Sequence, residues 1–211
     1  KINFDPKNFE QILGNLKASW EDPDLKVYVL SPNQKLDSPK NYYESRFEHF
    51  GKPFALGEDV NKGGRNSQRT GDIWFQVRYD SKHPDAYRHS SQAQPLHTDG
   101  SYIPLFPSST ILICEAAATE GGATTFIDNR VITTLLREQN SELYEFITKT
   151  KIHHERSGDH TFDFIINPDN DYRINYNYYC ISQSKNSPEH LKKINLFQDF
   201  LVTSEAVKEA T

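Results

Sequence analysis

The sequence lacks methionine altogether and has only two cysteines, Cys114 and Cys180, among its 211 residues. Each cysteine lies within an apolar stretch, which favours a buried, unreactive thiol over a disulfide or a catalytic nucleophile. The sequence also begins with Lys1 rather than with methionine. We therefore expect it to be part of a longer polypeptide.

Long apolar runs and an excess of basic residues are missing as well. No run approaches the roughly 20 apolar residues that span a bilayer, and the first residues carry no signal-peptide pattern. The formal net charge is -5 and the basic residues are scattered, so no surface for a polyanion is indicated. We expect a soluble, cytoplasmic protein that acts on a small molecule, without nucleic-acid or membrane partners.

The sequence does have enough apolar bulk for one core. It is 36% hydrophobic, and its 13 Phe, 11 Tyr and 2 Trp supply large rings for a β-rich interior or a wide pocket. This length and composition predict a single domain over residues 1–211.

Hydrophobic spacing and turn residues predict several helices and many short strands. The expected helices are 5–20, 41–50, 129–148 and one that begins at Pro188, and the expected strands are 27–30, 73–79, 110–118, 124–127, 162–166 and 172–181. Short strands between glycine and proline turns dominate the second half. We therefore expect an α+β fold with a double-stranded β-helix core (a cupin-like jelly roll) and flanking helices. The glycine-rich segment 57–71 is predicted to be a loop, either a lid or an ordinary surface loop, and the lid is the hypothesis carried forward.

Three segments place a carboxylate two residues after a histidine: His83-Pro84-Asp85, His97-Thr98-Asp99 and His153-His154-Glu155. On an extended backbone this spacing puts both side chains on one face. With a second histidine they form the facial triad that holds iron(II). The first and third segments lie in polar or charged surroundings and are predicted to be solvated, so His97 and Asp99 are the predicted metal ligands.

The neighbourhood of His97 carries a further signal. The chain reads QAQPLHTDGSYIP, then an apolar run, then EGGATTFID, so that a glycine turn presents Thr124. The hydroxyl of Thr124 suits a carboxylate of a cosubstrate, and the residue equally suits an ordinary β-branched position in a strand. This order, over roughly residues 73–181, resembles the taurine dioxygenase and clavaminate synthase-like oxygenases. The segment 172–176 also resembles the family strand that precedes the last helix.

The resemblance implies a double-stranded β-helix enzyme that uses iron(II), 2-oxoglutarate and O2. It implies hydroxylation or another oxidation of a small polar metabolite, with release of succinate and CO2. His97 and Asp99 would be iron ligands, and Thr124 would contact 2-oxoglutarate. Substrate contacts are expected from Gln76, Ser90 and Arg173, although each also suits an ordinary structural role.

Two residues of the family pattern, a histidine and an arginine, are not found in the sequence after the helix that begins at Pro188. Family members carry a distal histidine and, about a dozen residues later, an arginine that binds the 2-oxoglutarate carboxylate through its planar guanidinium. We expect both beyond Thr211. 

Two alternatives stay open. The first is a jelly-roll binding protein without turnover. The second is a zinc-dependent hydrolase, whose third ligand beside His97 and Asp99 would be one of His153, His154 and His160.

Overall fold

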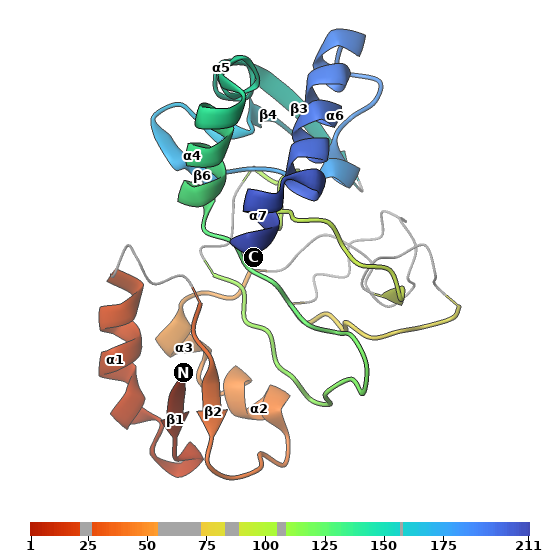
Figure 1. Cartoon of the computed structure of the whole chain (residues 1–211). Helices are drawn as coiled ribbons and strands as arrows, with labels where there is room; N and C mark the ends of the chain where they lie inside the picture. The colour runs from red at the N-terminus through yellow and green to blue at the C-terminus, as the bar shows by residue number, and fades with distance from the viewer. Residues whose placement is uncertain (22–26, 55–72, 83–88, 105–108, 157) are drawn as a thin grey trace. The chain divides into compact units, whose positions relative to one another are not determined.

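The computed structural model describes residues 1–21, 27–54, 73–82, 89–104, 109–156 and 158–211 (Figure 1). The chain divides into two compact units, and each is described by itself. Unit 1 comprises Lys1–Pro53 and Thr110–Ala123, and unit 2 comprises Phe54–Ser109 and Thr124–Thr211. The single domain over residues 1–211 stays a prediction. No helix among the described residues is long and apolar enough to cross a membrane.

Unit 1 combines short helices with a two-stranded parallel sheet. Its elements are η1 (Pro6–Asn8), α1 (Glu10–Glu21), α2 (Pro39–Glu44), α3 (Phe47–Phe50), β1 (Ile2–Phe4) and β2 (Leu30–Pro32). The predicted helix 5–20 is confirmed as η1 and α1, whereas the single predicted helix 41–50 is two short helices, α2 and α3. The first begins where Asp5 Oδ1 accepts a hydrogen bond from the Lys7 amide at 3.0 Å, and the last ends at Gly51, whose φ of 113° suits glycine. The buried core consists of Phe4, Phe9, Ile12, Leu13 and Leu16.

Unit 2 contains the remaining helices and two antiparallel strand pairs (Figure 1). Its elements are α4 (Asn129–Gln139), α5 (Ser141–Lys149), β3 (Lys151–Arg156), β4 (Asp159–Phe164), β5 (Ile166–Asn167), β6 (Asn170–Ile174), η3 (Tyr178–Cys180), α6 (Pro188–Thr203) and α7 (Glu205–Glu209). The single predicted helix 129–148 is two helices. Asn140 ends α4 through its amide, 2.9 Å from Leu136 O, and its side chain caps α5 by accepting from the Leu143 amide at 3.0 Å.

The core of unit 2 is mainly aliphatic. Helix α5 contacts α6 and β4, while α4 contacts β6. Side chains from the helices, from the strands and from the residues beside them are almost inaccessible to solvent at the centre, namely Leu136, Leu143, Ile147, Ile152, Ile165, Ile166, Tyr176, Ile194 and Phe197. Full burial of one such aliphatic side chain contributes roughly 1.5–3 kcal/mol, so this cluster dominates the stability of the unit.

Several predicted strands are wrong for the described residues. Segments 73–79, 110–118 and 124–127 form no ladder within the described part of the chain, and Val77 and Leu112 are 71% and 63% exposed. The predicted strand 172–181 ends at Ile174 and gives way to η3. A strand needs a hydrogen-bonded neighbour, which apolar composition alone does not supply. The α+β class is confirmed, whereas the double-stranded β-helix stays a prediction.

Two predictions about burial are also wrong. Cys114 is exposed, whereas Cys180 is buried as expected. His154 was expected in a solvated, charged segment, yet it is completely buried on β3. The strand alternation explains this, because His154 shares a face with the buried Ile152, whereas Lys151, His153 and Glu155 take the other face.

The burial of His154 predicts that stability falls in acid. Burial lowers the pKa of His154 to about 4, with a smaller lowering by His153 and partial offsets from the Ile152 backbone and the Asp163 carboxylate. The unfolded chain, with a histidine pKa of about 6.5, binds the proton more tightly. The contribution of neutral His154 to the free energy of unfolding is therefore complete above about pH 6.5. It is lost as the pH falls from there through 4, and the total loss is roughly 3 kcal/mol.

Urea unfolding at pH 7 and pH 4.5 measures this loss. We expect His154→Gln, which does not titrate, to lose less free energy of unfolding between these pH values than the wild type. His160→Gln, at an exposed position of β4, is the control and should behave as the wild type. An equal loss in His154→Gln and the wild type would contradict the assignment.

Candidate metal centre

His97 and Asp99 lie with their polar atoms facing each other. His97 Nε2 is 3.4 Å from Asp99 Oδ1. The other ring nitrogen, Nδ1, is 2.8 Å from the carbonyl oxygen of Pro95, and since a carbonyl only accepts, Nδ1 carries the hydrogen. Neutral His97 therefore directs the lone pair of Nε2 toward Asp99, the form in which an imidazole binds a metal. Gln94 Nε2 lies 3.2 Å from the same nitrogen.

The electrostatics of this pair suit a cation. When His97 is protonated, Nε2 donates a hydrogen bond to the Asp99 carboxylate. This bond lowers the pKa of Asp99 and raises the pKa of His97 against the opposing effect of burial. A proton and a metal ion therefore compete for the same place between Nε2 and Oδ1. The Asp99 side chain is 63% exposed, so an ion from solvent can reach it.

Thr98 fixes the position of the pair on the scaffold. Its amide donates to the carbonyl oxygen of Tyr176 at 2.6 Å, and its hydroxyl accepts from the Tyr176 amide at 2.8 Å. The Thr98 hydroxyl also lies 3.2 Å from the Tyr176 carbonyl. The side chain between the two predicted ligands thus points to the interior, as alternation along an extended segment requires.

A tight turn follows directly after Asp99. Gly100 has a φ of 75°, a conformation that favours glycine, and its carbonyl accepts from the Ile103 amide at 3.0 Å. The carbonyl oxygen of Ser101 accepts from the Thr161 hydroxyl on β4 at 2.7 Å and from Asn175 Nδ2 at 3.4 Å. Asp99 therefore lies between two anchors, Thr98 and Ser101.

A cavity of about 210 Å³ opens beside His97 within unit 2. Its walls come from the metal-pair segment, the segment before α4, and residues of α4, β6 and α6; they are Leu96, His97, Thr98, Thr125, Phe126, Ile127, Asn129, Ile132, Ile174, Tyr176, Phe197 and Leu201. Only a few polar groups interrupt an apolar lining, as is usual for small-molecule sites. Sequence reasoning did not find this wall, because α6 follows the His97 segment by about a hundred residues.

The structure brings together only some of the residues predicted for the site. Thr124 is exposed and lies next to the wall residue Thr125 rather than in the wall. Gln76 and Arg173 are exposed, and the Ser90 hydroxyl accepts from the Gln92 amide at 3.1 Å. None of these residues lines the cavity as the described residues define it. The proposed lid 57–71 and the segment 83–85 lie outside the described residues.

The third histidine–carboxylate segment is occupied by other interactions. Glu155 accepts a hydrogen bond from the Ser182 hydroxyl at 2.5 Å and pairs with Lys185 at 2.8 Å, while the His153 ring stacks on Phe162 with centroids 4.1 Å apart. Among the described residues no three of His, Cys, Asp and Glu form a metal-binding group. The zinc-hydrolase alternative, with a third ligand from His153, His154 or His160, therefore has no support in the structure.

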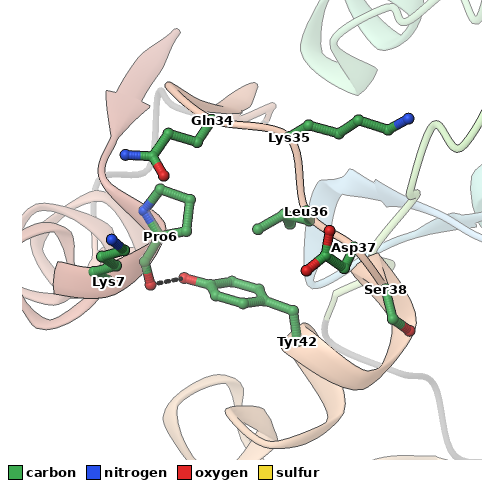
Figure 2. A pocket seen from close by; sticks show the side chains of 8 residues that line it. All are labelled: Pro6, Lys7, Gln34, Lys35, Leu36, Asp37, Ser38 and Tyr42. Atoms are coloured by element: carbon green, nitrogen blue, oxygen red, sulfur yellow. Dashed lines mark hydrogen bonds between the residues drawn. The ribbon is translucent and has the colours of Figure 1, made fainter.

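A larger cavity of about 390 Å³ lies in unit 1 (Figure 2). It is lined by Pro6, Lys7, Gln34, Lys35, Leu36, Asp37, Ser38 and Tyr42, and the Tyr42 hydroxyl donates to the Pro6 carbonyl oxygen at 2.9 Å. Figure 2 shows the Lys35 side chain extending away from the others. One carboxylate and no histidine give this cavity no donor set for a transition metal. The larger cavity therefore lacks metal ligands, and the smaller cavity at His97 is the better candidate for a metal site.

One imidazole and one carboxylate, both open to solvent beside a cavity, are donors that mononuclear non-heme iron(II) sites use. The residues present thus fit such a metal and supply two of its three usual protein ligands. The family model described as taurine catabolism dioxygenase TauD, TfdA family matches residues 39–193. This range contains His97, Asp99 and Thr124 and covers well over half of the chain, so the chain belongs to the TauD, TfdA family.

Members of this family are non-heme iron, 2-oxoglutarate-dependent dioxygenases. Their cofactors are Fe(II) and 2-oxoglutarate, and they act on small molecules with O2. The resemblance seen in the sequence is confirmed. A comparison with the curated proteins gives no match.

The Thr98 anchor predicts a stability effect. In Thr98→Val the buried Tyr176 amide loses its hydroxyl acceptor, which should lower the free energy of unfolding by about 1–3 kcal/mol. Urea unfolding measures this change. Thr203→Val, which removes an exposed hydroxyl that donates within α6, is the control and should change stability by less than about 0.5 kcal/mol. A Thr98→Val protein as stable as the control would rule out the anchor.

Proposed function

We propose that His97 and Asp99 hold iron(II) in this chain and that the adjacent cavity receives the substrate of a 2-oxoglutarate-dependent oxidation. The observation that supports this most strongly is the 3.4 Å approach of His97 Nε2 to Asp99 Oδ1 at the edge of that cavity. The family assignment supplies the metal and cosubstrate class. Bound iron(II) with 2-oxoglutarate would supply the activation of O2.

The residues of the chain position and shield the reacting groups. The hydrogen bond from His97 Nδ1 to the Pro95 carbonyl fixes the ring and its tautomer, so that Nε2 needs no reorientation to bind a cation. Apolar wall residues such as Ile132, Ile174 and Phe197 keep water away from the inner end of the cavity. The protein thereby contributes orientation and a dry cavity.

The substrate is proposed to be a small polar metabolite without a charge on the part that enters the cavity. Among the described residues the lining contains no Asp, Glu, Lys or Arg. A buried ionic group without a partner costs several kcal/mol, so such a group is disfavoured there. Thr125 and Asn129 offer hydrogen bonds to a hydroxyl or amide, and the apolar walls suit a carbon skeleton.

Other parts of the family pattern enter this proposal as predictions. Thr124 is proposed to contact 2-oxoglutarate, and Gln76, Ser90 and Arg173 to contact substrate. The double-stranded β-helix, the distal histidine and the 2-oxoglutarate arginine belong to the same proposal. A cytoplasmic location and the lack of nucleic-acid and membrane partners rest on composition alone.

The metal assignment predicts that His97→Ala and Asp99→Ala each abolish iron(II) binding. Each variant removes one of two adjacent donors, so succinate formation from 2-oxoglutarate should also stop while the fold is retained. Anaerobic iron(II) titration and a succinate assay measure these effects. His160→Ala and Asp169→Ala, which alter exposed residues, are matched controls and should bind iron(II) as the wild type does. Wild-type iron(II) affinity in either His97→Ala or Asp99→Ala would refute the assignment.

The role proposed for Thr124 predicts a change in the Michaelis constant for 2-oxoglutarate. Thr124→Val keeps the shape and removes the hydroxyl, and a lost hydrogen bond to a charged group costs roughly 1.5–3 kcal/mol, so KM should rise about 10- to 150-fold. Steady-state kinetics with varied 2-oxoglutarate measure it. Thr110→Val, at another exposed position, should leave KM unchanged. An unchanged KM in Thr124→Val would reject this role.

A further inference from the structure

A group of polar side chains surrounds the turn that follows Asp99. We call it the Ser101 cluster: Ser101, His154, Thr161 and Asn175. Thr161 and Asn175 both donate to the carbonyl oxygen of Ser101, at 2.7 and 3.4 Å. His154 is the direct partner of Thr161 in the β3–β4 ladder, so their side chains share one face with Cβ atoms about 5 Å apart.

The cluster is buried at an energetic cost. Ser101 and His154 are 0% exposed and Asn175 is 3% exposed. Ser101 Oγ, Asn175 Oδ1 and both ring nitrogens of His154 make no hydrogen bond to any residue that the structure describes. Each unsatisfied polar atom of this kind costs about 1–3 kcal/mol in a protein interior. Apolar side chains would be more stable in this place, so stability alone does not account for the cluster.

The cluster is coupled to the metal pair through a short stretch of backbone. The Thr98 anchor on Tyr176 and the Ser101 carbonyl are three residues apart, with Asp99 and Gly100 between them. Gly100, with its φ of 75°, is the flexible point of this stretch. Held at Thr98 alone, Asp99 could rotate about the following turn; held at both ends, its backbone is fixed.

We propose that Thr161 and Asn175 are positioning residues for Asp99, acting through the Ser101 carbonyl. The two donors fix the backbone after Asp99 and so keep its carboxylate beside His97 Nε2. Loss of the shorter hydrogen bond, from Thr161, has the larger effect. Removal of a group that orients a metal ligand in this indirect way typically lowers metal affinity by roughly 10- to 100-fold. For its effect on iron, the inference rests on the function proposed above.

The test compares Thr161→Val with Thr161→Ser in the metal-free and iron(II)-loaded protein. Valine keeps the shape and removes the hydroxyl, whereas serine keeps the hydroxyl. Thr148→Val is the matched control, because it removes a buried threonine hydroxyl that donates to Tyr144 O at 2.8 Å within α5, away from the site. Each protein is checked for the wild-type circular dichroism spectrum.

The first readout is hydrogen exchange of the Ile103 amide in the metal-free protein, since this amide bonds to Gly100 O within the turn. Exchange should be about 2- to 10-fold faster in Thr161→Val, because the loss of one hydrogen bond changes an equilibrium by about this factor. In Thr161→Ser and Thr148→Val it should be close to the wild-type rate. The second readout is the iron(II) dissociation constant from anaerobic titration. It should rise about tenfold in Thr161→Val and stay within about twofold in Thr161→Ser and Thr148→Val.

The two readouts separate the possible failures. Unchanged Ile103 exchange in Thr161→Val would overturn the positioning role whether or not iron binds. Faster exchange with an unchanged iron(II) dissociation constant would also overturn it, because the turn would then not control Asp99. If the wild type itself bound no iron(II) at His97 and Asp99, the proposed function would fail. The exchange result would still decide whether Thr161 holds the turn.

Discussion

The pairing of Thr98 with Tyr176 is the interaction on which the candidate site depends. It joins positions 78 residues apart in the sequence, and it ties the backbone and side chain of the residue between His97 and Asp99 to the core of unit 2. Because Thr98 points inward, its two neighbours point outward together and present one nitrogen and one oxygen to the same place. Without this anchor the two side chains would be disordered relative to each other, and the entropy lost on ordering them would weaken the binding of a metal ion.

The interior of unit 2 combines an apolar core with a buried polar cluster that lowers stability. Most of its buried side chains are aliphatic or aromatic and come from α4, α5, α6 and the strands beside them. Around the turn that follows Asp99, in contrast, the buried residues include the polar Ser101, His154 and Asn175, with polar atoms that find no partner in the described structure. Real proteins break the rules of packing mainly at functional sites. The position of this cluster, one turn after Asp99, is consistent with that expectation.

The sequence predicted local features better than those that need a distant partner. The predicted helix starts at residues 129 and 188 are confirmed. Each follows a residue, Asp128 or Ser187, whose side chain caps an amide two or three residues away, and such a start depends on local sequence alone. The His97–Asp99 spacing predicted their common face for the same reason. In contrast, the apolar segments 73–79 and 110–118 were expected to be strands, yet a ladder depends on a neighbour that the local sequence does not specify. The burial of His154 was missed because charged neighbours mask an alternation that only the hairpin reveals.

We expect His97 and Asp99 to share one iron(II) ion beside the cavity of unit 2. Crystals grown anaerobically with iron(II) and 2-oxoglutarate, and measured at the iron absorption edge, locate that ion directly. We expect one anomalous peak about 2.0–2.2 Å from both His97 Nε2 and Asp99 Oδ1, the range of comparable zinc–nitrogen and zinc–oxygen bonds. A peak bound to His153 or His160 instead, or no peak at His97 under saturating iron(II), would contradict it.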